Sequence, residues 1–236
     1  MQDTLNRVKQ AAAHVRLSVK KLYEPSLQNI ENNTIVLADT SAGKRLFCIG
    51  HCDLFHGVSV QNGDALVQVC ELTLENARVL RKLFPWTAPQ PVGLQTSFGA
   101  GDRIGVATPG HIRALRAYKV MPVLAQQSIR EMDRTVRQSQ EVMDDACWAV
   151  FQEGFQDGFG SDADHLKTEA DIRNTVGAGF IGFTVDPSDH INNNADDMTG
   201  SGLDAAFEKL FNSQTEAADF LKRYAEKELT ASGADR

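Results

Sequence analysis

Residues 120–166 read VMPVLAQQSIREMDRTVRQSQEVMDDACWAVFQEGFQDGFGSDADHL and place a short apolar run on each side of a helical segment. The first run, VMPVLAQQS at 120–128, predicts a strand. Apolar residues at helical spacing from Val142 to Val150 predict a long helix that ends in the glycines of EGFQDGFG. A second strand is predicted near DADHL at 162–166, and this order implies a right-handed crossover between parallel strands.

The same alternation extends in both directions along the chain. RIGVAT at 103–108 predicts an earlier strand, and FIGFTV at 180–185 predicts a later one. A helix is expected from Pro109, with Thr108 as its cap. Another is expected between Thr168, in a capping pair with Asp171, and Gly177. Two more helices should follow, the second opened by a capping box of Ser213 and Glu216.

Four strand–helix units narrow the fold to a barrel or a doubly wound sheet. No GxGxxG follows the first strand, whereas polar residues gather where successive strands end, which favours a (β/α)8 barrel. We therefore predict an α/β fold with about half of a TIM-like barrel over residues 92–236.

A different pattern precedes this region. Residues 34–50 predict a hairpin about the turn DTSAGK, DALVQVCEL at 64–72 predicts a strand, and Thr73 caps a helix that Pro85 ends. The segment PWTAPQPVG at 85–93 holds three of the seven prolines, which cannot continue a helix or a central strand. We place a boundary there, after a small α+β region at 1–91.

Bulk composition limits the class of protein. A hydrophobic share of 42% over 236 residues supports a substantial core, and a formal charge of -7 disfavours nucleic acid and anionic membrane surfaces as partners. The N-terminus lacks the apolar core of a secretion signal and no stretch is long enough for a bilayer, so we expect a cytoplasmic protein.

The four cysteines should be reduced thiols in the interior. His51, Cys52 and His56 in HCDLFH have no second ligand cluster nearby, so we do not place a metal there.

Catalytic groups of a barrel lie where each strand ends. These positions are Thr108 to His111, Gln126 to Glu131, Asp164 to Lys167 and Asp186 to His190. Together they hold histidines, carboxylates and a lysine, the mixture needed to bind a divalent metal and move protons.

The segment DADHLK allows the most specific functional interpretation of these sets. The imidazole of His165 could bind a metal. Asp164 could orient this imidazole or act as a base, and Lys167 could hold a substrate carboxylate. The competing interpretation is a helix-capping acid, a hydrogen-bonded histidine and a surface lysine, and the pattern alone does not separate the two.

The other candidates have ordinary structural alternatives. Asp186 and His190 in VDPSDH could join the first cluster, but Asp, Pro and Ser are also common turn residues. Glu131 could be an acid or base, or could simply stabilise the first turn of a helix. GAGDRIG, with Asp102 and Arg103, could be only a glycine-rich turn.

Five segments, in this order and spacing, resemble the tagaturonate epimerase family: GDRIGVATPGHIRA, PVLAQQSIREMDRT, EVMDDACWAVFQEGF, ADHLKTEADI and VDPSDHI. The resemblance covers residues 99–191. It implies a barrel-like fold, a divalent metal such as Zn, Mn, Co or Ni, and interconversion of the sugar acids tagaturonate and fructuronate. On this basis the catalytic candidates are Glu131 and Asp164, the substrate-binding candidates are His111, Gln127 and Lys167, and the metal-ligand candidates are His165, Asp186 and His190.

Members of the family continue well beyond this length, with further strand-end histidines and acids. The resemblance therefore predicts a truncated chain whose activity is absent or very low, and whose open strand edges cause it to associate with itself. The alternatives are an aldolase-like metal-dependent lyase and a non-catalytic remnant that binds a sugar acid or a partner.

Overall fold

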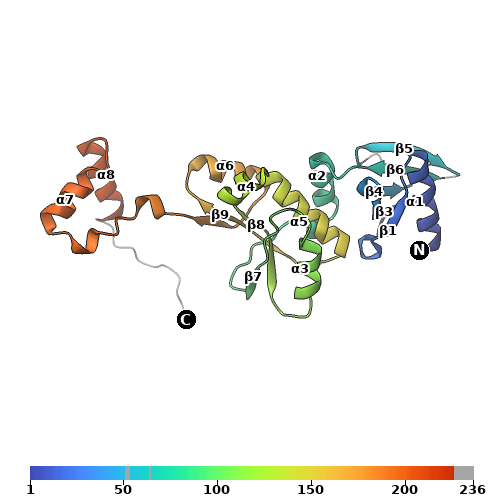
Figure 1. The fold of residues 1–236 in the computed structure, drawn as a ribbon, viewed down its shortest axis with the longest axis horizontal. Helices are drawn as coiled ribbons and strands as arrows, with labels where there is room; N and C mark the ends of the chain where they lie inside the picture. The colour runs from blue at the N-terminus through green and yellow to red at the C-terminus, as the bar shows by residue number, and fades with distance from the viewer. Residues whose placement is uncertain (51–53, 64, 226–236) are drawn as a thin grey trace. The chain divides into compact units, whose positions relative to one another are not determined.

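The computed structural model describes residues 1–50, 54–63 and 65–225 of the chain. These residues form two compact units, Met1–Asp186 and Pro187–Arg236, with the described part of the second ending at 225. Figure 1 shows their elements in order, and each unit is described by itself. The boundary expected near residue 92 lies inside the first unit, between its two sheets.

The first unit begins with an antiparallel sheet. Its strands are β1 (Val19–Leu22), β2 (Gln28–Ile30), β3 (Asn33–Thr40), β4 (Gly43–Ile49), β5 (Gly57–Asn62) and β6 (Ala65–Cys70), in the order β1-β3-β4-β6-β5 with β2 on β3. The hairpin expected at 34–50 is confirmed by β3 and β4, which pair from Thr34↔Ile49 to Thr40↔Gly43. Gly43 has φ 87°, which glycine adopts without strain.

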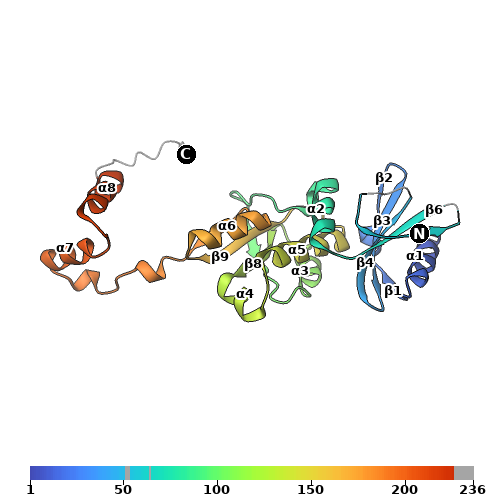
Figure 2. The same cartoon turned by 90° about the horizontal axis from the view of Figure 1, so that it is seen from above.

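Both faces of the antiparallel sheet are covered. Helix α1 (Gln2–His14) packs on one face through Val8, Ala11 and Ala12, next to Phe47 of β4 (Figures 1 and 2). The other face is covered by helix α2 (Leu74–Leu83), which Thr73 caps as predicted, and by side chains of helix α5 (Ser139–Glu153). The 3-10 turns η1 (Glu24–Ser26) and η2 (Pro85–Thr87) also contact α5. This double cover explains why β3 and β4 are apolar at consecutive positions rather than alternate ones.

The second sheet of the first unit is parallel, as predicted. Its strands are β7 (Ser97–Gly99), β8 (Met121–Ser128), β9 (Gly160–Leu166) and β10 (Phe183–Val185), and they lie side by side in chain order. The connections contain α3 (Thr108–Leu115), α4 (Ile129–Thr135), α5 and α6 (Glu169–Ala178). The core between sheet and helices includes Leu124, Val150 and Phe159.

The strand predicted at 103–108 is wrong. The first parallel strand is β7, and residues 103–107 form a loop around the carboxylate of Asp102. This carboxylate accepts hydrogen bonds from the backbone N–H groups of Ile104, Gly105, Ala107 and Thr108, at 2.6 to 3.2 Å. Those donors are therefore not available to a neighbouring strand. Thr108 is also not the cap of α3; it is the first residue of the helix, and its hydroxyl donates to Asp102 at 3.0 Å.

Several helix ends differ from their predictions. The interpretation of Glu131 as a residue in the first turn of a helix is confirmed, since Ser128 and Glu131 form the capping box that opens α4. Thr168 and Asp171 cap α6 as expected, but the helix continues through Gly177 to Ala178 and ends at Gly179, which has φ 96°. The strand expected over FIGFTV is confirmed only in its last half, because β10 is three residues long.

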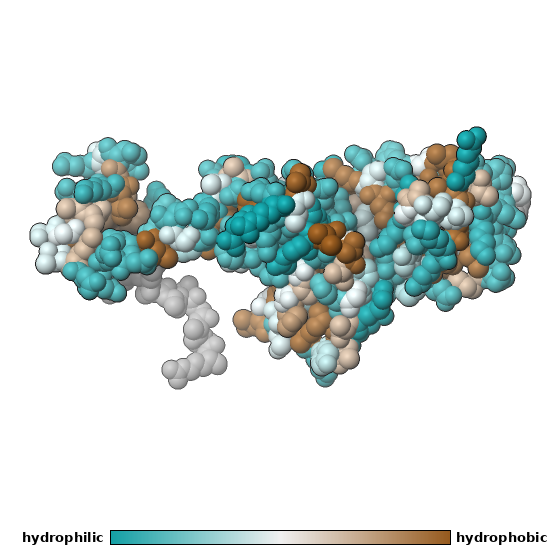
Figure 3. Space-filling view, in the orientation of Figure 1, coloured by the Kyte–Doolittle hydropathy of each residue, from teal (hydrophilic) through white to brown (hydrophobic). Residues whose placement is uncertain are grey.

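The second unit is helical. It contains η3 (Ser188–His190), η4 (Ala195–Asp197), α7 (Gly200–Glu208) and α8 (Gln214–Tyr224). Ser213 accepts from the Glu216 N–H as predicted, but the Glu216 carboxylate accepts from Asn212 instead of closing a capping box. Aromatic rings of Phe207, Phe211, Phe220 and Tyr224 contact each other, and apolar atoms reach the surface here (Figure 3).

None of the helices in the described ranges combines the length and the apolar character required to cross a bilayer.

Candidate functional site

The carboxyl ends of β8, β9 and β10 meet at one edge of the parallel sheet. Ser128 at the end of β8 is the register neighbour of Asp164 on β9. Asp186, which follows β10, donates its backbone N–H to the Leu166 carbonyl at 2.9 Å. The sequence candidates Asp164, His165, Lys167 and Asp186 therefore gather at this edge, which we call the strand-end site.

Asp164 and His165 form the most specific contact of the strand-end site. The Asp164 Oδ1 atom lies 2.8 Å from His165 Nδ1, and the His165 side chain is 53% exposed. A carboxylate on Nδ1 fixes the tautomer and leaves Nε2 to face a ligand. Among the described residues no partner of Nε2 is found, so this nitrogen can take part in binding.

The backbone of His165 is unusual for its residue type. His165 has φ 56°, a left-handed conformation in a residue with a Cβ atom. Such a conformation costs on the order of 1 kcal/mol relative to glycine and is often found at functional sites. His165 therefore departs from the extended conformation of a strand near the end of β9, where its side chain is exposed.

Lys167 and Asp186 form a second pair at the strand-end site. Lys167 Nζ lies 3.7 Å from Asp186 Oδ2, and the two side chains are 42% and 17% exposed. The pair links the ends of β9 and β10 and leaves the ammonium partly open to solvent. A substrate carboxylate could approach this ammonium, as predicted from the sequence.

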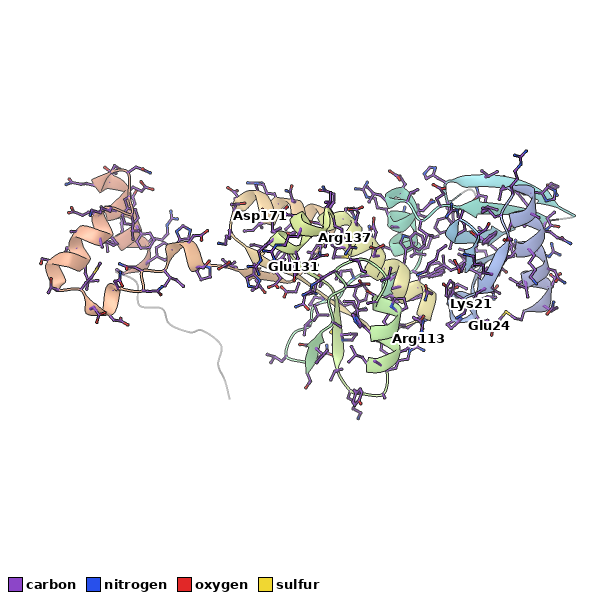
Figure 4. All side chains as sticks on the ribbon, viewed as in Figure 1. Lys21, Glu24, Arg113, Glu131, Arg137 and Asp171 are labelled. Atoms are coloured by element: carbon purple, nitrogen blue, oxygen red, sulfur yellow. The ribbon has the colours of Figure 1, made fainter. Side chains whose placement is uncertain are left out.

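Glu131 lies at the start of α4, next to the end of β8 (Figure 4). Its carboxylate accepts from the Ser128 N–H at 3.1 Å and pairs with Arg103 Nε at 3.0 Å. Partial burial acts to raise the pKa of Glu131, but the Ser128 hydrogen bond and Arg103 outweigh it, so the pKa lies below the ordinary value. This environment makes Glu131 a weaker proton acceptor than an unpaired carboxylate.

A row of polar side chains across the parallel sheet was not predicted from the sequence. Gln126 Nε2 donates to Asp162 Oδ2 at 3.2 Å, and Thr184 Oγ1 donates to Asp162 Oδ1 at 2.8 Å. Gly99 on β7 makes room for this row, because a Cβ atom there would lie 2.5 Å from Gln126 Oε1. The alternation of Asp162 and Asp164 about the buried Ala163 was the signal that could have revealed it.

Two substrate-binding candidates lie in other surroundings. Gln127 is 1% exposed, and its amide is bonded to Arg137 at 2.9 Å and to Thr135 at 3.2 Å. A direct substrate contact would have to break one of these bonds. His111 lies on α3, where its Nδ1 atom is 2.9 Å from the Ala100 carbonyl oxygen. Their roles in substrate binding remain predictions.

The metal ligands predicted from the resemblance are only partly brought together. His165 and Asp186 are both at the strand-end site, whereas His190 belongs to the second unit, in η3. Within the described residues, no three His, Cys, Asp or Glu side chains are grouped so as to hold a metal ion. The donors present supply one imidazole oriented by a carboxylate, which is less than a complete ligand set.

The cysteine predictions can be followed for three of the four residues. Cys48, Cys70 and Cys147 are buried, as expected, and burial raises the pKa of the Cys147 thiol to about 11. His51 and Cys52 lie outside the described residues. His56 is described, and its backbone N–H donates to Asn76 at 2.7 Å.

Comparison with known proteins connects this chain to one family. The family model described as tagaturonate epimerase matches residues 23–235. A tagaturonate/fructuronate epimerase from Thermotoga maritima is 52% identical over 124 residues, which are 52% of this chain and 26% of that protein.

Solved structures give the same result. The glycerol-bound crystal structure of the fructuronate-tagaturonate epimerase UxaE from Cohnella laeviribosi superimposes with a TM-score of 0.73 at 34% identity, over 95% of this chain and 44% of the other. The native structure of that protein superimposes with a TM-score of 0.73 at 35% identity, over 93% of this chain and 44% of the other. This chain thus spans less than half the length of the relatives that it matches. The chain belongs to the tagaturonate epimerase family.

Proposed function

We propose that the chain carries part of the active site of a keto-hexuronate epimerase, which interconverts tagaturonate and fructuronate in hexuronate catabolism. The observation that carries the proposal is the Asp164–His165 pair, with its left-handed histidine, at the carboxyl edge of a parallel sheet. Family membership supplies the substrate class. We also assign the protein to the cytoplasm.

The parallel sheet corresponds, in this proposal, to about half of a (β/α)8 barrel. Its four strands follow one another in chain order without the reversal that defines a doubly wound sheet. In such barrels the catalytic groups lie at the carboxyl ends of the strands, where Asp164, His165 and Lys167 are found. Among the described residues no further strand pairs with the outer sides of β7 and β10, and such edges favour association with a second copy, which light scattering would detect as a concentration-dependent increase in mass.

The reaction inverts a carbon that is β to the ketone, so enolisation alone cannot reach it. In one route a base removes the proton of the hydroxyl on that carbon, the adjacent carbon–carbon bond breaks to an aldehyde and an enolate, and the bond reforms on the opposite face. The other route, transient hydride removal from that carbon, would need a separate hydride acceptor such as a nicotinamide, for which the sequence offers no GxGxxG motif after its first predicted strand. Asp164 is the better placed proton acceptor, because its only described partner is His165, whereas Glu131 is paired with Arg103.

The remaining side chains bind and orient the substrate. Lys167 would hold the substrate carboxylate, and the Gln126–Asp162–Thr184 row offers donors and acceptors for hydroxyl groups. A divalent metal ion, with His165 as a ligand and Asp186 as a further candidate, would supply Lewis acidity at the ketone when bound.

The experiment compares His165→Ala with His14→Ala, a control at the exposed end of α1. Zinc, manganese, cobalt and nickel are titrated into the wild-type chain and both variants by calorimetry. His165→Ala should lose roughly 10- to 100-fold in metal affinity, and His14→Ala should lose none. Equal affinities for all three proteins would reject His165 as a ligand.

Turnover is measured separately, by product analysis after incubation with tagaturonate. We expect very low activity from this chain, and strong activity from a full-length relative that falls at least about 100-fold when the histidine matching His165 becomes Ala. Fructuronate as the product supports an epimerase, whereas release of two shorter fragments would indicate a lyase. An unchanged rate in that variant would refute the role of His165.

A further inference from the structure

The antiparallel sheet of the first unit has two outer edges that differ in how they are protected. One edge is formed by β1 and β2, which are four and three residues long and are separated by the 3-10 turn η1 with Pro25. Strand β1 carries Lys20 and Lys21, and its register with β3 shifts between Val19 and Lys21. Short length, lysines, a proline and an irregular register are features that keep an edge strand from pairing with another chain.

The other edge of this sheet, β5, has none of these features. Strand β5 pairs with β6 at six consecutive positions, from Gly57↔Cys70 to Asn62↔Ala65, without a register shift. Its sequence, GVSVQN, contains no charged residue and no proline. It is also longer than the other outer strands, since β1 has four residues and β2, β7 and β10 have three each. Among the described strands, β5 is therefore the least protected edge.

The backbone of β5 is held at both ends, and its outer side has no strand partner in the described part of the chain. Just before the strand, the His56 N–H donates to Asn76 Oδ1 at 2.7 Å, and Asn76 Nδ2 donates to the His56 carbonyl at 2.9 Å. At the end of the strand, Asn62 Nδ2 donates to the Arg7 carbonyl at 3.1 Å. Apart from the ladder with β6, no backbone hydrogen bond of residues 57–62 is found among the described residues. Outward N–H and C=O groups on a strand that is already held in place bind a partner strand with little loss of conformational freedom.

The side chains of β5 suit pairing with an identical strand. Val58 is 58% exposed, whereas Val60, on the same face of the sheet, is 7% exposed. When two β5 strands pair antiparallel with Ser59 opposite Ser59, each Val58 lies opposite Val60 of the other copy and gains an apolar neighbour. No like charges meet in this arrangement. An acidic or basic strand would find no charge on β5 to pair with, which favours the identical strand as the partner.

We propose that β5 is an interaction surface for a second copy of this chain, whose own β5 continues the antiparallel sheet across a two-fold axis. Because each copy contributes the same strand, the contact is self-complementary and ends at a dimer. Association of β10 with β7 of another copy would instead leave outer edges available and could continue to larger assemblies. The β5 contact is separate from the strand-end site and does not depend on the epimerase function proposed above.

Cross-linking through single cysteines tests the contact and its register. Cys52, which lies outside the described residues, is replaced by Ser, and the other natural cysteines are buried. On mild oxidation, Ser59→Cys should give at least about tenfold more covalent dimer than Gln61→Cys or Lys20→Cys, because only residue 59 lies opposite itself, close to disulfide spacing. A yield at Gln61 or Lys20 that equals the yield at Ser59, or no cross-link at Ser59, would overturn the proposal.

Sedimentation equilibrium of the full chain separates association through β5 from association through β10. The dissociation constant of the dimer should rise at least roughly fivefold in Ser59→Lys, because two lysines would lie opposite each other, and should not change in Ser59→Thr. Phe183→Lys, on the outer strand of the parallel sheet, should leave the constant within about twofold of the wild-type value.

Two sedimentation results would overturn the proposal. One is a wild-type chain that stays monomeric at every concentration. The other is a dimer that is lost in Phe183→Lys and kept in Ser59→Lys. A thermal melt of Ser59→Lys shows whether the variant is folded, and if it is not, the cross-linking yields decide.

Discussion

The two sheets of the first unit differ in how completely they are covered. The antiparallel sheet is buried on both faces: Ile35 and Leu37 pack toward α2 and α5, while Val36 and Ala38 pack toward α1. The outer strands of the parallel sheet, β7 and β10, are exposed at all three of their residues. The side chains of β7 and β10 are therefore packed less tightly than those of β3 and β4, and the exposed polar groups that could do chemistry lie at the second sheet.

The largest expected difference in stability is between alanine variants of two phenylalanines, one in each sheet. Phe47 of β4 is 0% exposed, whereas Phe183 of β10 is 42% exposed. Phe47→Ala should reduce the free energy of unfolding by about 3 to 5 kcal/mol, and Phe183→Ala by less than about 1 kcal/mol. Urea denaturation of both variants measures the difference, and equal losses would contradict the contrast between the sheets.

A smaller difference in stability is expected between methionine variants of two arginines. Arg137 is 10% exposed and donates to the Asp102 carbonyl, to Gln127 and to Asp145. Arg137→Met should cost about 2 to 4 kcal/mol, because buried acceptors lose their donor. Arg173 pairs with Glu169 on the exposed face of α6, and Arg173→Met should leave stability almost unchanged. Thermal melts of the two variants at one pH compare their losses of stability. Losses of similar size would show that the hydrogen bonds of buried Arg137 contribute no more to stability than the exposed pair of Arg173.

The pH dependence of stability gives the smallest expected effect. Burial raises the pKa of Asp145 to about 6 against the lowering effect of Arg137, and the nearby Asp102 and Asp144 carboxylates raise it further. Because the folded pKa is above the unfolded value, the folded state holds the proton longer, and this group makes stability fall as pH rises from about 4 to about 6.

Asp145→Asn removes this contribution. The free energy of unfolding of wild type minus that of the variant should therefore decrease by about 1 kcal/mol or less between pH 4 and pH 7, a small change because the side chain is 42% exposed. Urea titrations at several pH values provide the measurement. A difference that stays constant or rises with pH would show that the Asp145 pKa is not raised.

Local patterns predicted much of the fold. The hairpin of β3 and β4, the strands β8 and β9, and the caps at Thr73 and Thr168 were all present in short stretches of sequence. The segment at 103–108 has the composition of a strand, but its backbone donors are taken by Asp102, a competition that composition does not record.

The candidate site was less predictable than the fold. Asp164, His165, Lys167 and Asp186 could be placed at one edge because parallel strands end together. The faces of Gln126 and Gln127 could not be assigned by counting along β8, because the register with β9 shifts between Val123 and Ala125. Nor does sequence show that Asp162 bridges two neighbouring strands.

Helix α5 has a consequence for how the first unit unfolds. Trp148 and Phe151 on this helix belong to the core of the antiparallel sheet, whereas Met143, Cys147 and Val150 belong to the core of the parallel sheet. If α5 opens, both cores lose part of their packing at once, so neither sheet can melt while the other keeps its full set of contacts. The least stable sheet edge and the most stable strands are thereby joined in one cooperative transition, and hydrogen exchange of α5 amides should follow global rather than local opening.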